Sequence, residues 1–325
     1  MTMRVRVVLE GGGMCGVYQI GVLQELKSME RDGLVNIDAI SGASIGSYLA
    51  FCYFNDSLES ALETLNAATC SFKEDSQNTS TFHDRIRGEI LECDDKVFQN
   101  IKSGCIYSSR IDVATVSNTI DHEYNTREEL FDAIACSSHV PYVTGDSWSR
   151  LSTNGRKYID GVFPHIFRDR TNCEYAILYV CNGSFSRPVS ILSSRLGETT
   201  RVDMGAQDAR RFFITRKSTR YCSFVHNWTQ PDFIVLRMKQ IFAWVVRTLL
   251  FVLTSIVYGV VAPIRLIISV VMDDIFLHLM FGDMDHCSFL HDVGYAALTG
   301  CAIASSTFID MFNEILANRH QQDLP

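Results

Sequence analysis

Two glycine-rich turns, each placed after a short β-branched strand, constrain the fold of this chain more than any other feature. The first predicted strand, residues 4–9, runs into Gly11–Gly13, and the second, residues 35–40, runs into the turn 42–46. Between them, residues 14–30 carry apolar side chains at helical spacing. Because the crossover of such a strand–helix–strand unit is right-handed, the strands are parallel and both turns open at one edge of the sheet. The sequence therefore predicts one place for chemistry.

The second turn has the pattern of a nucleophile elbow. It reads Gly-Ala-Ser-Ile-Gly, a G-x-S-x-G sequence in which a strand bends sharply into a helix and holds up a serine hydroxyl. Side chains at Gly42 and Gly46 would collide with the neighbouring backbone in so tight a turn. The helix expected over residues 45–54 places its positive end beside Ser44. A helix start with small residues for close packing has the same pattern, so the pentapeptide alone does not establish a nucleophile.

The first turn fits two kinds of site. Gly11, Gly13 and Gly16 spell the G-x-G-x-x-G pattern of a dinucleotide site, which needs an acidic residue closing the next strand, about 20 residues on. That strand ends without one, because Asp38 lies within it and a serine turn occupies the place of the ribose. The second interpretation, which we favour, is that the backbone amides of Gly11–Met14 form an anion-binding hollow for a tetrahedral oxyanion.

Together the two turns resemble the motif pair of the patatin-like phospholipase family. Members carry a G-G-G-x-[R/K]-G loop near the start of the domain, a G-x-S-x-G turn shortly after it, and a D-G-[G/A] motif much later. Here the third motif is Asp160-Gly161-Val162, and residues 135–141 resemble the family's small-residue and proline segment. The resemblance covers residues 4 to about 182.

The resemblance implies a lipid acyl hydrolase, of the phospholipase A or lysophospholipase kind, with a Ser-Asp dyad and no histidine. Asp160 would take the proton of Ser44, which attacks an ester carbonyl, and water would then release the acyl group with Asp160 again as base. Neither a metal nor an organic cofactor is required. The implied site residues are Ser44 and Asp160 in catalysis, Gly11, Gly12 and Gly13 in the oxyanion hole, and the motif glycines Gly16, Gly42, Gly46 and Gly161.

Two departures from the family pattern define an alternative. Cys15 stands where the family has a cation in the oxyanion loop, and Val162 replaces the small residue after Asp-Gly. The alternative is a catalytically weak or inactive patatin-fold protein that binds membranes. A Ser-His-Asp hydrolase using His165 or His226 is a further rival, which the early position of Ser44 disfavours, since several strands precede the elbow in that fold.

Composition supports a large folded core. The chain has 325 residues, 47% of them hydrophobic and 20% charged, and we expect a three-layer α/β fold with a central mainly parallel sheet and helices on both faces. The net charge of −8 argues against a general nucleic-acid binder. Eleven scattered cysteines without C-x-x-C pairs indicate reduced thiols in an intracellular compartment, and the His and Cys residues within 283–292 are better explained as a solvated loop than as a metal site.

The last third of the chain differs in composition and suggests a membrane partner. We divide the chain into a catalytic domain, 1–235, a hydrophobic membrane-associating segment, 238–282, and a C-terminal helix, 283–325, that packs back on the core. Within the segment, residues 241–272 are apolar almost throughout, and an embedded or interfacial hairpin is favoured over a membrane span or a buried helix. The expected partners are a membrane surface and its acyl lipids, or another acyl ester. The basic, aromatic stretch 201–220 is either a headgroup contact or a solvated helix face.

Other elements are expected from local patterns. We predict helices over 57–68 and 127–137, strands over 110–119, 157–159 and 175–181, and an irregular connection or lid over 70–87.

Overall fold

The structure is a computed structural model, and it describes residues 2–74, 80–115, 117–141, 144–145, 147–167, 175–181, 198–241 and 245. Contacts divide the chain into two compact units, residues 1–236 and 237–325. The fold and the candidate site lie in the first unit. The predictions for 238–282 and 283–325, including the loop 283–292, lie almost entirely outside the described residues. Within the described ranges, no helix is long and apolar enough to cross a membrane.

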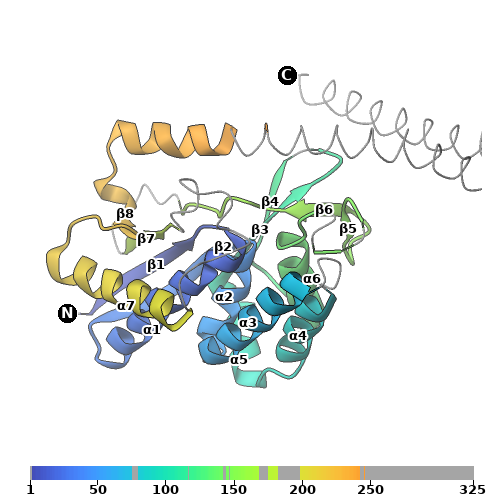
Figure 1. Cartoon of the computed structure of the whole chain (residues 1–325), viewed down its shortest axis with the longest axis horizontal. Helices are drawn as coiled ribbons and strands as arrows, with labels where there is room; N and C mark the ends of the chain where they lie inside the picture. Colours follow the sequence, from blue (N-terminus) through green and yellow to red (C-terminus); the bar gives the residue numbers. More distant parts are fainter. Residues whose placement is uncertain are drawn as a thin grey trace, which may run out of the picture. The chain divides into compact units, whose positions relative to one another are not determined.

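Strands and helices alternate through the first part of the chain (Figure 1). In order, the elements are β1 (Met3–Leu9), η1 (Gly13–Cys15), α1 (Gly16–Arg31), β2 (Val35–Ala43), α2 (Ile45–Phe54), α3 (Leu58–Glu74), α4 (Ser80–Leu91), α5 (Asp95–Asn100), η2 (Ile101–Cys105), β3 (Ile106–Asp112), β4 (Asn118–Asp121), α6 (Arg127–Ser137), β5 (Arg150–Leu151), β6 (Lys157–Asp160), β7 (Ala176–Val180), α7 (Glu198–Thr215), β8 (Cys222–Phe224) and η5 (Val225–Asn227). A further helix occupies residues 230–241.

The strands form one mixed sheet in the order β5-β6-β3-β2-β1-β7-β8, with β4 also paired to β3. The four central strands, β3, β2, β1 and β7, are parallel, whereas β4, β5, β6 and β8 pair antiparallel. The predicted α/β class with a mainly parallel central sheet is confirmed. Leu9 pairs with Gly42 in the β1–β2 register, so both glycine-rich turns open at the same edge, as the strand–helix–strand argument predicts.

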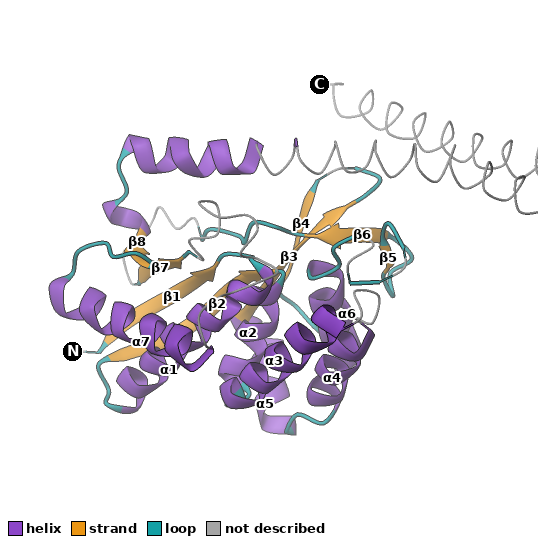
Figure 2. Cartoon of the chain, viewed as in Figure 1, coloured by secondary structure: helices purple, strands orange, loops and turns teal. Residues whose placement is uncertain are grey.

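Helices α1–α7 lie on one side of the sheet, where the larger core forms (Figure 2). Alternate residues of β1 point to this side, including the fully buried Val5 and Val7, because side chains alternate along a strand. Helix α7 packs closely on α1, since a Cβ at Gly21 would lie 1.9 Å from the carbonyl oxygen of Val202. The opposite side of the sheet carries a smaller cluster that includes Val8, Phe167 and Tyr179, with Trp228 and Leu236 packed on it.

Two local predictions were wrong. Residues 70–87 were expected to be irregular, but α3 continues to Glu74 and α4 occupies Ser80–Leu91. The side chains of Ile86 and Ile90 are fully buried, so α4 is amphipathic despite its polar composition. A single strand was expected over 110–119, but β3 ends at Asp112, whose Oδ1 accepts hydrogen bonds from the amides of Ala114 and Thr115. That side-chain turn reverses the chain into β4.

The basic stretch 201–220 forms most of α7, and neither sequence interpretation accounts for all of it. Phe212 is fully buried in the core, and Arg201 is also buried. Arg210, by contrast, is exposed and donates two hydrogen bonds to the carboxylate of Glu25 on α1. Within this stretch, Arg210 therefore joins α7 to α1.

Candidate active site

Ser44 lies in the turn between β2 and α2 with a strained backbone. Its φ of 55° and ψ of −128° fall where side chains are disfavoured, and strain of this kind is characteristic of a nucleophile elbow. The motif glycines permit the turn, because a Cβ at Gly42 would lie 2.2 Å from the carbonyl carbon of Gly46, and one at Gly46 would lie 2.8 Å from the carbonyl oxygen of Leu9. Ser44 is 8% exposed, which leaves a small opening to solvent.

Gly11 marks the point at which the three predicted motifs meet. A Cβ at this position would lie 3.2 Å from the Cβ of Ser44 and 3.0 Å from the carbonyl oxygen of Val162. The serine turn and the segment after Asp160 therefore both lie close to the glycine loop at Gly11. Only a glycine fits here without displacing one of the other two segments.

Asp160 is the last residue of β6, and the pairing of β6 with β3 brings it close to the serine turn. Ala43, just before Ser44, pairs with Ser109 of β3, and the next residue, Arg110, pairs with Asp160 on the other side. The serine and the aspartate thus flank one short stretch of β3. Asp160 is 8% exposed, and its Oδ1 accepts a 2.6 Å hydrogen bond from the amide of Val162.

Val162 has a backbone conformation that β-branched residues rarely adopt. Its φ is 54°, in the left-handed region. In the sequence, Val162 stands out only as a departure from the family pattern. In the structure, its left-handed backbone places local strain beside Asp160.

Arg201 is a residue at the glycine loop that sequence reasoning missed. It comes from α7, is 4% exposed, and its Nη1 donates a 3.2 Å hydrogen bond to the carbonyl oxygen of Met14. Met14 lies in η1, next to Cys15, where the family pattern has a cation. A cation therefore does reach this loop, from a helix remote in sequence, and no local pattern could have indicated it.

The two histidines of the rival interpretation, His165 and His226, have identifiable contacts, and so does His139. His139 Nε2 lies 3.1 Å from the carbonyl oxygen of Ser147, His165 stacks on Tyr107, and His226 stacks on Phe224. Burial lowers the pKa of His139, which keeps the ring neutral at physiological pH.

A buried charge cluster supports the strand pairing beside Asp160. The Arg110 guanidinium lies 2.7 Å from Asp121 and 3.6 Å from Asp132, donates to the hydroxyl of Ser152, and sits over the ring of Tyr158. Burial raises the pKa of Asp121, and the attraction of Arg110 opposes that rise. These contacts join β3, β4, α6 and β6, and so fix the strand that ends at Asp160.

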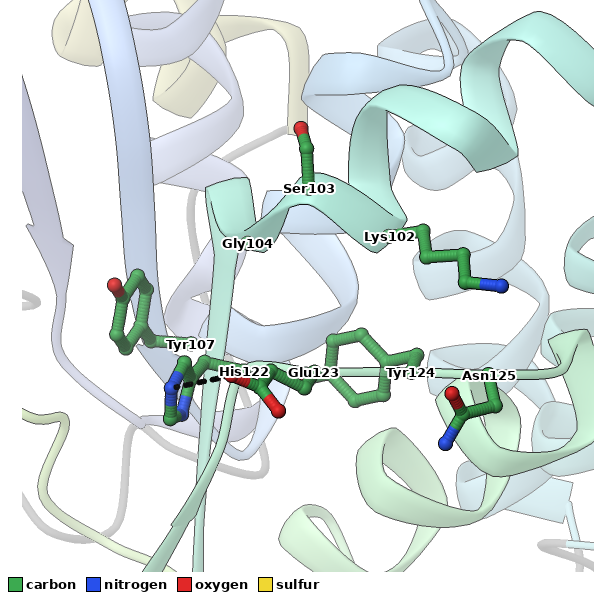
Figure 3. A pocket seen from close by; sticks show the side chains of 8 residues that line it. All are labelled: Lys102, Ser103, Gly104, Tyr107, His122, Glu123, Tyr124 and Asn125. Atoms are coloured by element: carbon green, nitrogen blue, oxygen red, sulfur yellow. Dashed lines mark ion pairs between the residues drawn. The ribbon is translucent and has the colours of Figure 1, made fainter.

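A separate cavity of about 280 Å³ lies at the junction of η2, β3 and β4 (Figure 3). It is lined by Lys102, Ser103, Gly104, Tyr107, His122, Glu123, Tyr124 and Asn125. His122 and Glu123 form an ion pair at 3.8 Å on its wall. None of the lining residues belongs to the three motifs, so the cavity is distinct from the candidate active site.

Asp38 and the cysteines bear on the dinucleotide and metal interpretations of the sequence. Asp38, the acidic residue nearest to the ribose position, forms an ion pair with Arg4 at 2.7 Å. In the part of the chain that the structure describes, no three His, Cys, Asp or Glu residues are grouped to hold a metal ion. The cysteines in that part are all free thiols.

Comparison with known proteins identifies the family. The model of the patatin-like phospholipase family matches residues 7–177, more than half of the chain, and includes all three motifs. No curated protein matches the chain. Among solved structures, VipD from Legionella pneumophila matches with 14% identity and a TM-score of 0.33, over 54% of this chain and 49% of that one, about half the length of each. On the family match, this chain belongs to the patatin-like phospholipase family.

Proposed function

We propose that the protein is a serine-dependent lipid acyl hydrolase that uses a Ser44–Asp160 dyad and an oxyanion hole formed by Gly11, Gly12 and Gly13. Membership of the family supports lipid acyl hydrolysis at the level of the family. The observation that supports the finer proposal is the meeting of the three motifs at Gly11, where an added Cβ would lie 3.2 Å from the Ser44 Cβ and 3.0 Å from the Val162 carbonyl oxygen.

The proposed reaction needs only groups from these motifs. Asp160 accepts the proton of the Ser44 hydroxyl as Oγ attacks the ester carbonyl, and the glycine amides stabilise the negative charge on the tetrahedral oxygen. The alcohol leaves with the proton returned by Asp160. Water, deprotonated by Asp160, then attacks the acyl-enzyme and releases the fatty acid, which regenerates Ser44.

We further propose that the protein works at a membrane surface in an intracellular compartment. Three apolar side chains at the start of the helix over residues 230–241, Phe233, Ile234 and Val235, are 43%, 59% and 55% exposed. They precede the apolar sequence 241–272, and exposed apolar side chains favour insertion into the headgroup region of a bilayer. Free thiols in the described part of the chain fit a reducing compartment.

The test compares wild type with Ser44→Ala and Asp160→Asn on a short-chain nitrophenyl ester and on phospholipid vesicles. Asp38→Asn is the matched control, because Asp38 lies within β2, the strand that leads to Ser44, but its carboxylate is paired with Arg4. We expect Ser44→Ala to fall to background, Asp160→Asn to lose about 10²–10⁴-fold in kcat, and Asp38→Asn to keep full activity. Vesicle products then identify the lipid class.

A catalytically inactive membrane-binding protein is the second candidate, favoured by the strained Val162 beside Asp160. If wild type hydrolyses neither substrate faster than Ser44→Ala yet floats with liposomes, this candidate replaces the hydrolase. If wild type is active but stays in the soluble fraction with neutral and anionic liposomes, the membrane part of the proposal is wrong and the hydrolase stands.

A further inference from the structure

The C-terminal end of α6 contacts both halves of the proposed dyad. The carbonyl oxygen of His139 accepts a 2.9 Å hydrogen bond from the amide of Asp160, and that of Ser137 accepts one of 3.2 Å from the amide of Gly161. The Ser137 side chain points to the other half, because its Oγ accepts a 3.0 Å hydrogen bond from the amide of Ser44. A single residue thus bonds to both turns.

Every hydrogen-bonding position of the Ser137 hydroxyl is used. Its proton goes to the carbonyl oxygen of Ser109 at 2.6 Å, and its two lone pairs accept from the amide of Ser44 and from the Ser47 hydroxyl, 2.9 Å away. Ser109 is the β3 residue that pairs with Ala43, next to Ser44. The hydroxyl is fully buried, so water cannot replace it.

The amide of Ser44 needs such a partner for two reasons. Ser44 is the N-cap of α2, so its amide precedes the helical hydrogen bonds, and a buried amide without an acceptor is strongly disfavoured. Ser44 also has a positive φ, which persists only when surrounding contacts enforce it. The bond to Ser137 is one such contact, made from α6 rather than from the turn itself.

We infer that Ser137 is a positioning residue for the nucleophile, which holds the strained Ser44 backbone in register with the strand that ends at Asp160. This inference rests on the proposed function for its catalytic consequence. Without the Ser137 hydroxyl, the Ser44 turn relaxes toward an ordinary backbone conformation, and the Ser44 Oγ is displaced relative to the proposed base and oxyanion hole. A displacement of about 1 Å at a reacting atom lowers a rate about 100-fold.

The test uses Ser137→Ala and Ser137→Cys, with Ser108→Ala as the matched control. Ser108 is also fully buried and its hydroxyl donates to Ser47 at 3.1 Å, so it belongs to the same hydroxyl network, but it does not bond to Ser44. Ser137→Cys keeps the side-chain shape and leaves only a weak sulfur acceptor, so it remains informative if the alanine variant does not fold.

Two readouts are measured on the full chain. Hydrogen exchange of the Ser44 amide should be at least about tenfold faster in both Ser137 variants than in Ser108→Ala, because the amide has lost its acceptor. On the nitrophenyl ester, kcat should fall about 10- to 100-fold in the Ser137 variants with KM unchanged, and stay near wild type in Ser108→Ala. If Ser137 had a purely structural role, the Ser137 variants and Ser108→Ala would lose similar thermal stability and would have similar kcat values.

The outcomes separate the two proposals. If Ser44 amide exchange and kcat in both Ser137 variants match those of Ser108→Ala, the positioning role is overturned while the hydrolase stands. If amide exchange accelerates as expected but wild type is no faster than Ser44→Ala, the proposed function is overturned and Ser137 retains only a structural bond to the turn.

Discussion

The strain at Val162 can be measured by comparing glycine and alanine at that position. Val162 is half-buried at φ 54°, and its amide donates to Asp160 Oδ1 through a backbone bond that neither substitution removes. Val162→Ala keeps a Cβ in the left-handed region, which costs about 1–2 kcal/mol, whereas Val162→Gly has no such cost. Glycine, in turn, lowers the folding stability by about 0.5–1 kcal/mol relative to alanine, because it gives the unfolded chain more conformational freedom. The difference predicts that Val162→Gly is more stable than Val162→Ala by about 0.5–1 kcal/mol.

The assay is thermal or urea unfolding of the two variants side by side. A difference of this size corresponds to about 1–4 °C in Tm for a domain of this length. Both variants lose the same packing relative to wild type apart from one methyl group, so the comparison isolates the backbone. The hydrogen bond to Asp160 is kept in both, so their kcat values should be alike.

Gly88 is a control position at which alanine, rather than glycine, should give the more stable protein. It lies inside α4, and a Cβ there would meet nothing within 4 Å, so Gly88→Ala should be more stable than wild type by about 0.5–1 kcal/mol. If alanine exceeds glycine in stability at position 162 as it does at position 88, then the backbone of Val162 is not left-handed and the argument for strain beside Asp160 is refuted.

Two further predictions concern buried basic side chains. Burial, and then the charge of Arg150, lower the pKa of His83 from 6.5 to about 4. Between these two pKa values the unfolded chain binds a proton that the folded chain excludes, so about 3 kcal/mol of stability is lost as pH falls from 6.5 to 4. Urea unfolding at a series of pH values should show this fall in the free energy of unfolding. In His83→Gln the dependence on pH should be weaker. Arg201→Met removes the charged donor to the Met14 carbonyl, which should lower the free energy of unfolding by about 1.5–3 kcal/mol and should also lower kcat. The control is Arg210→Met, at an exposed position, which should change kcat little. Equal kcat values in the two variants would contradict a role for Arg201 at the glycine loop.

The elements nearest to the serine turn could be predicted from the sequence because local signals there agree. The helix predicted over 45–54 has those bounds in the structure, and the strand predicted over 35–40 forms part of β2. Each combines a continuous apolar pattern with a glycine turn, and turn chemistry and periodicity point to the same boundary. The parallel pairing of β1 with β2 then follows from the handedness of the crossover.

The predictions failed where a tertiary contact outweighs local composition. In α4, the polar residues that suggested a loop lie on the exposed face, and Ile86 and Ile90 supply enough buried surface to fold the helix. At Asp112, a single carboxylate that captures two backbone amides ends β3 inside a run of β-branched residues. Both outcomes depend on which face is buried, and spacing of residues alone does not determine that.

The relation between Ser44 and Asp160 could not be derived from sequence because it depends on the register of β3 with two strands that run in opposite directions. β2 is parallel to β3 and brings Ala43 opposite Ser109, while β6 is antiparallel and brings Asp160 opposite Arg110. A slip of one residue in either pairing would turn the affected side chains to the other face of the sheet.

The contacts of β3 explain why neither slip is expected. The buried Arg110 guanidinium is paired with Asp121 of β4 and lies over Tyr158 of β6, so that a shift of β6 would take an aromatic ring away from a buried charge. On the other side, the Ser137 hydroxyl joins the Ser109 carbonyl to the Ser44 amide, which ties the β2 turn to the same point of β3. The positions of the proposed nucleophile and base therefore depend on these buried polar contacts of one strand as well as on the close approaches that the glycines of the three motifs permit.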